Sequence, residues 1–180
     1  QMTVGELAAY VAEHLRSRGF DVLLSGGACV TLYSRGKYVS MDIDFVPMGL
    51  TSRRRLREAL ADIGFTEKGR CFAHPEADFF LDFPAGPPAV GKQPVRETRT
   101  LKFSTSTLRL LSPTDCVKDR LANYYYFGDR QCLHQALMVV QAEEVDLDEV
   151  QRWSVEEGQQ AAFEEIEGDL QRAGNPNTQA

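Results

Sequence analysis

Hydrophobic residues near the amino terminus recur with the spacing of an amphipathic helix. The pattern begins at Val4, within residues 3–6, which have the Ser/Thr-x-x-Glu form of a capping box, and it ends at Gly19. A short apolar run, residues 20–24, then stops at Ser25, Gly26 and Gly27, and further apolar residues indicate a second short helix. The sequence therefore predicts a helix, a strand, a glycine turn and another helix.

Residues 41–47 predict a second strand, in which aspartates alternate with apolar residues up to Phe45. Asp42 and Asp44 point to one face of this predicted strand, while Ile43 and Phe45 point to the other. The rise of a strand places the two carboxylates roughly 6 to 7 Å apart, which is close enough to share bridging metal ions.

The remainder of the first 111 residues predicts one helix and two strand pairs. Thr51 can cap a helix over residues 52–63, whose cluster of arginines lies largely outward, either as a solvated face or as a contact for a nucleic-acid acceptor. These arginines are Arg53, Arg54, Arg55 and Arg57. The strand pairs are residues 65–72 with 78–83 and residues 96–103 with 107–111, and residues 84–94 form a Pro/Gly-rich connecting loop.

From residue 112 onward the pattern is helical almost without interruption. Ser112 and Pro113 have the chemistry of a helix start. We expect an α/β domain over residues 1–111, a helical part over residues 112–173 and a loose tail over residues 174–180. The helices are expected near residues 113–126, 129–143, 146–153 and 155–172.

The charge of −6 is unevenly divided along the 180 residues. Residues 1–110 hold 15 Lys and Arg against 12 Asp and Glu, whereas residues 111–180 hold 5 against 14. The amino-terminal part can therefore contact a polyanion although the whole chain is acidic, because electrostatic attraction depends on the charge of the local surface.

No apolar run approaches the ~20 residues that a bilayer-crossing helix needs, and the amino terminus lacks the layout of a secretory signal. The expectation is a soluble, cytoplasmic protein with no membrane partner. The cysteines are far apart and lack the spacing of zinc ligands, so we expect buried, reduced thiols. They are Cys29, Cys71, Cys116 and Cys132.

A third carboxylate lies in an aromatic segment. Residues 79–83 place Asp82 among apolar side chains, where an unpaired ionised carboxylate is costly, so a cation should sit beside it. A metal ion is one candidate, and an ion pair with Arg99 or Arg109 from neighbouring strands is the other. Asp78 lies on the same strand face and is the competing assignment for the third carboxylate.

Two short motifs together resemble those of a known group of enzymes. Gly26 and Gly27, fourteen intervening residues and the Asp42-Ile43-Asp44 triplet are similar to the motifs of the nucleotidyltransferase superfamily. The chain looks most like its minimal and abortive-infection (AbiEii-like) toxin–antitoxin branch. The resemblance implies an α+β nucleotidyltransferase fold, with a mixed, mostly antiparallel sheet flanked by helices and a carboxyl-terminal helical bundle.

The resemblance also implies roles for individual residues. Asp42, Asp44 and Asp82 would bind the metal, Mg²⁺ or Mn²⁺, and Asp82 would help to activate the acceptor hydroxyl. Lys118, on an early helix of the carboxyl-terminal part, would contact the triphosphate and count among the catalytic residues. The nucleotide would further be held by Ser25, Gly26, Gly27 and Ser40.

The implied reaction transfers a nucleoside monophosphate from an NTP to an acceptor, with release of pyrophosphate. An RNA acceptor resembling tRNA and a protein acceptor are both open, as is a cognate toxin or antitoxin partner. A hypothesis of a different class is a catalytically inactive module that keeps the fold and binds a partner protein or a nucleotide through its acidic helical half. The acidic residues of segments 143–149 and 156–167 motivate it.

Overall fold

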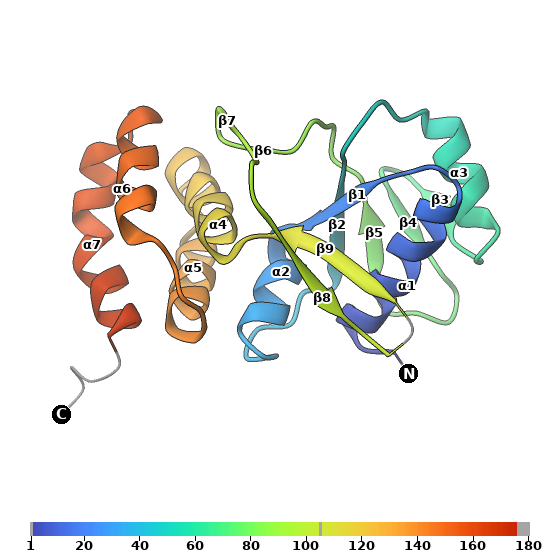
Figure 1. Ribbon diagram of the computed structural model, residues 1–180, viewed down its shortest axis with the longest axis horizontal. Helices are drawn as coiled ribbons and strands as arrows, with labels where there is room; N and C mark the ends of the chain where they lie inside the picture. The colour runs from blue at the N-terminus through green and yellow to red at the C-terminus, as the bar shows by residue number, and fades with distance from the viewer. Residues whose placement is uncertain (1, 105, 176–180) are drawn as a thin grey trace.

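The structure, a computed structural model, describes residues 2–104 and 106–175 (Figure 1). Its main sheet consists of β1 (Val22–Ser25), β2 (Asp42–Pro47), β3 (Thr66–Lys68), β4 (Cys71–Ala73), β5 (Phe80–Asp82), β8 (Thr98–Lys102) and β9 (Thr107–Leu111). The strand order is β3-β4-β5-β2-β1-β9-β8. The β1–β9 and β2–β5 pairs are parallel and the other pairs are antiparallel, so the sheet is mixed and mostly antiparallel, as predicted.

Some helices flank this sheet, and the carboxyl-terminal helices gather beside it at one end (Figure 1). The helices of the amino-terminal part are α1 (Val4–Ser17), α2 (Gly26–Tyr33) and α3 (Arg53–Ala61). The carboxyl-terminal helices, which gather at the left of Figure 1, are α4 (Pro113–Phe127), α5 (Arg130–Ala142), α6 (Leu147–Glu156) and α7 (Gln160–Gly174). Because α2 contacts both α4 and α5, the helical bundle packs directly against the part that carries the glycine turn.

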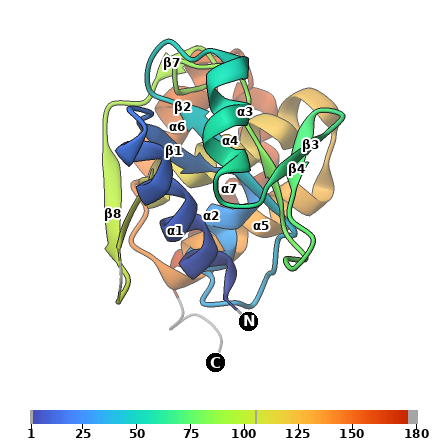
Figure 2. The ribbon, with the colours of Figure 1, turned by 90° about the vertical axis from the view of Figure 1, so that its right-hand side faces the viewer.

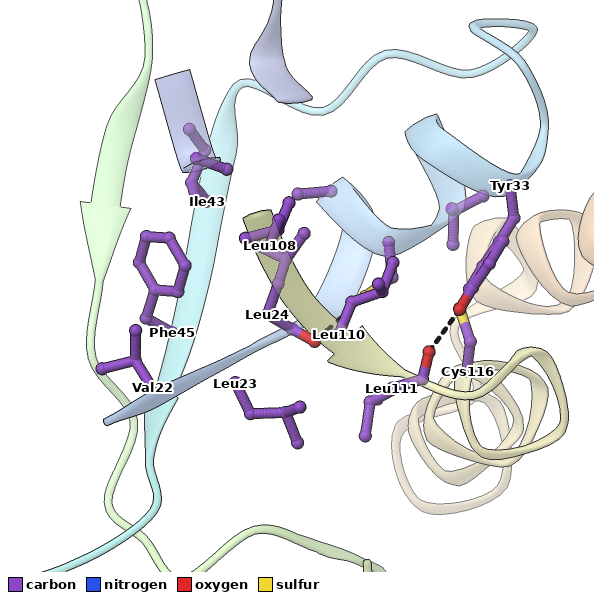
Figure 3. Close-up of a cluster of buried hydrophobic side chains, with 14 of the residues drawn as sticks. Val22, Leu23, Leu24, Tyr33, Ile43, Phe45, Leu108, Leu110, Leu111 and Cys116 are labelled. Atoms are coloured by element: carbon purple, nitrogen blue, oxygen red, sulfur yellow. Dashed lines mark hydrogen bonds between the residues drawn. The ribbon is translucent and has the colours of Figure 1, made fainter. Parts of the chain in front are cut away.

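The core surrounds β1, an inner strand of the sheet, whose residues are all buried. Leu23 and Leu24 are fully buried, and Figure 3 shows them among side chains of β2, β9 and α2. The hydroxyl of Tyr33, at the end of α2, donates a hydrogen bond to the carbonyl of Leu111 (Figure 3). This contact joins α2 to the end of β9, one residue before α4 begins with its N-cap Ser112.

Most boundaries agree with the sequence pattern, and the differences have local causes. The capping box at Thr3 is confirmed. Residues 65–72 are not one strand, because Gly69 adopts a positive φ and turns the chain between β3 and β4. Ser52, not Thr51, is the N-cap residue of α3. The predicted connecting loop contains a small hairpin, β6 (Ala89–Val90) with β7 (Gln93–Pro94).

Three further expectations can be compared with the fold. Cys29, Cys116 and Cys132 are buried free thiols as expected, whereas Cys71 is only partly buried because it begins the short strand β4 beside a surface turn. Among the described helices, none has the length and apolar character needed to span a membrane. The last helix reaches Gly174, and residues 176–180 of the predicted tail lie outside the described residues.

Candidate active site

Three adjacent strands bring predicted site residues into one row. Strand register aligns Ser25 of β1 with Asp44 of β2, and Asp44 with Asp82 of β5. Ile43 and its partner Leu81 are fully buried on the opposite face. Asp42, two residues before Asp44, shares its face and is exposed, so the predicted alternation of this strand is correct.

Gly26 lies directly against the Asp44 carboxylate. Its φ of 66° is in the left-handed region, and a Cβ atom built on it would come within 2.0 Å of Asp44 Oδ2. At Gly27 the same addition would approach Ser40 Oγ to 2.9 Å. Both positions therefore need glycine, because any side chain would displace the group that faces the turn.

Ser40 fixes the entry into β2. Its backbone N–H donates to Thr31 Oγ1 at 2.9 Å, and its hydroxyl donates to the Asp42 carbonyl at 2.9 Å while accepting from the Asp42 N–H at 3.2 Å. Thr31 belongs to α2, so these bonds connect the helix that follows the glycine turn to the strand that carries the aspartates. Ser40 thus holds the backbone of the site.

A cavity of about 300 Å³ opens over this row. Gly27, Ser40, Asp42, Asp44 and Asp82 line it, whereas Ser25 and Gly26 do not. Its other walls come from the β3–β4 turn, from α4 and from the start of α5, and they include Arg70, Arg120, Asp129 and Gln135.

The surroundings of the Asp44 carboxylate disfavour its charged form. The pKa of Asp44 is raised to about 6, chiefly because the group is buried, and also because Asp82, Asp119 and Asp42 lie near it. The Arg120 guanidinium opposes this rise. Without a further cation the site therefore carries an excess of negative charge that a bound cation would relieve.

Arg120 is a site residue that the sequence analysis missed. Its side chain is 13% exposed, and it donates hydrogen bonds to Asp119 Oδ2 at 2.6 and 3.0 Å and to Gln135 Oε1 at 3.3 Å. These contacts hold the guanidinium at the wall of the aspartate cavity. The signal in the sequence that could have identified Arg120 is its position beside the core residue Leu121, on a helix that begins directly after β9.

Lys118 lies in a different place from the aspartates. Its amine donates to Glu149 Oε1 at 2.6 Å and to Gln93 Oε1 at 2.7 Å, and it lies 3.2 Å from Asp115 Oδ1. This side chain lines a separate cavity between α4, α6 and β7. Two residues along a helix correspond to a rotation of about 200°, so Lys118 and Arg120 leave α4 on nearly opposite sides.

The cation beside Asp82 is neither of the two arginines that the sequence suggested. Arg70 Nε lies 3.6 Å from Asp82 Oδ2. Arg99 instead pairs with Glu143 and Arg109 with Asp21, because β8 and β9 lie on the far side of β1 from β5. Asp78, the competing third carboxylate, lines another cavity, beside α1. Asp82 is therefore the carboxylate that joins Asp44.

The donors of the aspartate cavity suit a hard divalent cation, since they are carboxylate oxygens. Within residues 2–104 and 106–175, no three His, Cys, Asp or Glu side chains already form a group that could hold a metal ion. Asp44 and Asp82 are instead a register pair, with Asp42 one position further along the same face. Such a pair matches the usual Mg²⁺ arrangement, in which one or two carboxylates act together with substrate phosphates.

Solved structures share this architecture. A crystal structure of an antigenic nucleotidyltransferase-like protein from Paracoccidioides brasiliensis matches 93% of this chain over 92% of its own, with a TM-score of 0.64 and 14% sequence identity. A crystal structure of ANT(2")-Ia in complex with adenylyl-2"-tobramycin matches 86% of this chain over 93% of its own, with a TM-score of 0.50 and 16% identity.

A solution structure of the antibiotic-resistance factor ANT(2'')-Ia matches 90% of this chain over 91% of its own, again with a TM-score of 0.50 and 16% identity. Neither protein-family models nor the sequences of characterised proteins give a match. The structural likeness and the mixed sheet with its flanking helices show that the chain has an α+β fold of the nucleotidyltransferase-like type.

Proposed function

We propose that this chain is a metal-dependent nucleotidyltransferase that moves a nucleoside monophosphate from an NTP to an acceptor and releases pyrophosphate. The observation that carries the proposal is the row of Asp44 and Asp82, which faces a cavity at the amino-terminal end of α2. Carboxylates for divalent ions and a helix start for phosphates are the two requirements of the reaction, and they occur here side by side.

The triphosphate is held at the start of α2. The side chain of Ser25, the N-cap residue, makes no capping hydrogen bond, which leaves the first-turn N–H groups of the helix for another acceptor. Gly27 lines the cavity without a side chain, so phosphate oxygens can approach the backbone. Arg120 faces the same cavity and supplies a buried positive charge for the phosphates.

Asp42, Asp44 and Asp82 would hold Mg²⁺ or Mn²⁺ together with oxygens of the triphosphate. When bound, the metal neutralises charge on the phosphates and orients the reacting oxygens. Asp82 accepts the proton of the acceptor hydroxyl, whose oxygen forms a bond to the α-phosphorus. The bond from the α-phosphorus to its bridging oxygen breaks, and pyrophosphate leaves with that oxygen.

The acceptor sets the biological role. The resemblance to AbiEii-like proteins supports an RNA or a protein acceptor and a place in a toxin–antitoxin pair. The ANT(2")-Ia structure that contains adenylyl-2"-tobramycin adds an aminoglycoside as a third class of acceptor to test. A non-catalytic module of the same fold would bind the nucleotide and transfer nothing.

A labelling assay tests the reaction. The protein is incubated with each α-labelled NTP, Mg²⁺ or Mn²⁺, and RNA, protein or an aminoglycoside as acceptor. Asp44→Asn and Asp82→Asn should each lower the transfer rate by about a hundredfold or more, because metal binding or proton removal is lost. Asp78→Asn is the matched control, since this aspartate lines another cavity, and it should keep the wild-type rate. Equal labelling by the wild type and the Asp44 variant would contradict the proposal.

Arg120 and Lys118 are distinguished by two different measurements. Arg120→Gln should weaken Mg²⁺–ATP binding roughly tenfold or more in a calorimetric titration, because a charge-assisted contact is lost.

Lys118→Met should lower the free energy of unfolding by about 3 kcal/mol, since it leaves Glu149 and Asp115 without their buried partner. The folded Lys118 variant should bind nucleotide like the wild type. Lost nucleotide affinity with unchanged stability would show that Lys118 contacts the triphosphate.

Asp44 should make the stability of the metal-free protein depend on pH. A pKa raised to about 6 in the folded state means that folding favours the protonated carboxyl, so this contribution is complete below about pH 4 and is lost as the pH rises through about 6. We therefore expect Asp44→Asn to be more stable than the wild type by about 3 kcal/mol near neutral pH. Urea unfolding should show this difference shrinking towards about pH 4. A difference that does not change with pH would contradict the raised pKa.

A further inference from the structure

A second cavity lies away from the proposed reaction site, beside the amino-terminal half of α1. It has a volume of about 290 Å³, and its walls come from α1, from the turn that joins α3 to β3, and from the loop that joins β4 to β5. Figure 2 shows α1, α3 and the β3–β4 hairpin on the side of the molecule turned to the viewer. None of the described residues that line this cavity also lines the aspartate cavity. We call it the α1 cavity.

The α1 cavity lies on the face of the sheet that points away from the aspartates. Phe72 of β4 and Leu81 of β5 are register partners, and both are fully buried on the face opposite Asp82. His74 and Phe79, which line the cavity, lie two residues from these partners, just outside the ends of the two strands. Because side chains alternate along a strand, these two residues continue the same face. A ligand in the α1 cavity therefore does not compete with substrates at Asp82.

Aromatic and aliphatic side chains make up most of the lining of the α1 cavity. Phe65 is only 2% exposed and Phe79 is half-buried, so their rings form an inner wall. The ring of His74 packs against Phe65, with 5.1 Å between the ring centroids. Met2 and Tyr10 line the same cavity and are 51% and 42% exposed. Covering such exposed apolar surface stabilises a complex, so the lining favours a ligand with an apolar body.

The formal charges that line the α1 cavity are of one sign. Glu76 and Asp78 both lie in the loop between β4 and β5, and the described lining residues include no Lys or Arg. His74 accepts a hydrogen bond through Nδ1 from the backbone N–H of Glu76 at 3.0 Å, a role that leaves this nitrogen without a proton. The two carboxylates therefore determine the charge of the lining, and they favour a cationic group on the ligand.

We propose that the α1 cavity binds a small organic cation, in which an ammonium group is attached to an aromatic or aliphatic body. The body packs against Phe65 and Phe79, and the ammonium group lies beside Glu76 and Asp78. The ring of Tyr10 adds a cation–π contact. A volume of about 290 Å³ suits a ligand of fragment size, at the lower end of the range for small-molecule sites. The site is independent of nucleotidyl transfer, and its ligand class differs from an anionic NTP and from a heavily hydroxylated aminoglycoside.

The test is a titration of the full chain with phenethylammonium, followed by backbone amide NMR. Phenethyl alcohol is the matched ligand, because it has the same number of non-hydrogen atoms and carries no charge. We expect amide signals of lining residues such as Leu7 and Ala77 to shift, with a dissociation constant of about 1 mM or lower. The alcohol should produce shifts at the same residues and bind about fivefold more weakly, since it lacks the cationic contacts.

Two variants separate the contribution of charge from that of apolar contact. Glu76→Gln/Asp78→Asn should lower the affinity for phenethylammonium about fivefold, to that of the alcohol, and leave alcohol binding unchanged. Tyr10→Ala should weaken both ligands about threefold or more, because exposed ring surface is lost. Glu13→Gln is the control, since Glu13 is an exposed residue of α1 that does not line the cavity, and it should change neither affinity.

Thermal unfolding confirms that each variant is folded. Shifts confined to residues outside the α1 cavity, or no binding of phenethylammonium at millimolar concentration, would overturn the proposal of a site. Equal binding of the cation and the alcohol, or a double variant that keeps the wild-type preference for the cation, would overturn the assignment to a cationic ligand.

Discussion

The close approach of Gly26 to Asp44 is the constraint on which the site depends. The register of β1 with β2 aligns Ser25 with Asp44, and the chain turns into α2 at the next residue with a positive φ. A Cβ at Gly26 would lie 2.0 Å from the Asp44 carboxylate, so the glycine turn and this aspartate can share the space only without a side chain. The start of a helix and a partly buried carboxylate are thereby held beside one another, and Asp82 adds its charge from the next strand.

The elements of the fold were accessible to sequence reasoning because their signals are local. A capping box, a glycine turn, alternating strand residues and an uninterrupted helical segment each depend on neighbours in the chain. The alternation around Ile43 also predicts correctly that Asp42 and Asp44 share a face. The order of strands is a different matter, since it depends on pairings between distant segments. For that reason the arginine alternative for the cation beside Asp82 points to Arg99 or Arg109, on β8 and β9, whereas the arginine that the structure places there comes from the β3–β4 turn.

Lys118 and Arg120 lie two residues apart on α4 but line different cavities. A family lysine can be aligned to a position on a helix from sequence, but a shift of two residues turns the side chain to nearly the opposite side. Here the lysine joins Gln93, Asp115 and Glu149 in a buried contact between α4, β7 and α6. Arg120, held by Asp119 and Gln135, reaches the cavity of the aspartates instead. The bundle thus contributes a cation to the site and an ion-pair network to its own packing.

The central claim is that Asp44 and Asp82 bind a divalent ion together with the triphosphate of an NTP. Crystals grown with Mn²⁺ and a non-hydrolysable ATP analogue would test it directly, because Mn²⁺ is located by its anomalous scattering. The account predicts a peak between Asp44, Asp82 and the phosphate oxygens, with the triphosphate at the start of α2 and Arg120 in contact with it. A nucleotide bound elsewhere, or one bound here with no metal at the aspartates, would contradict the account.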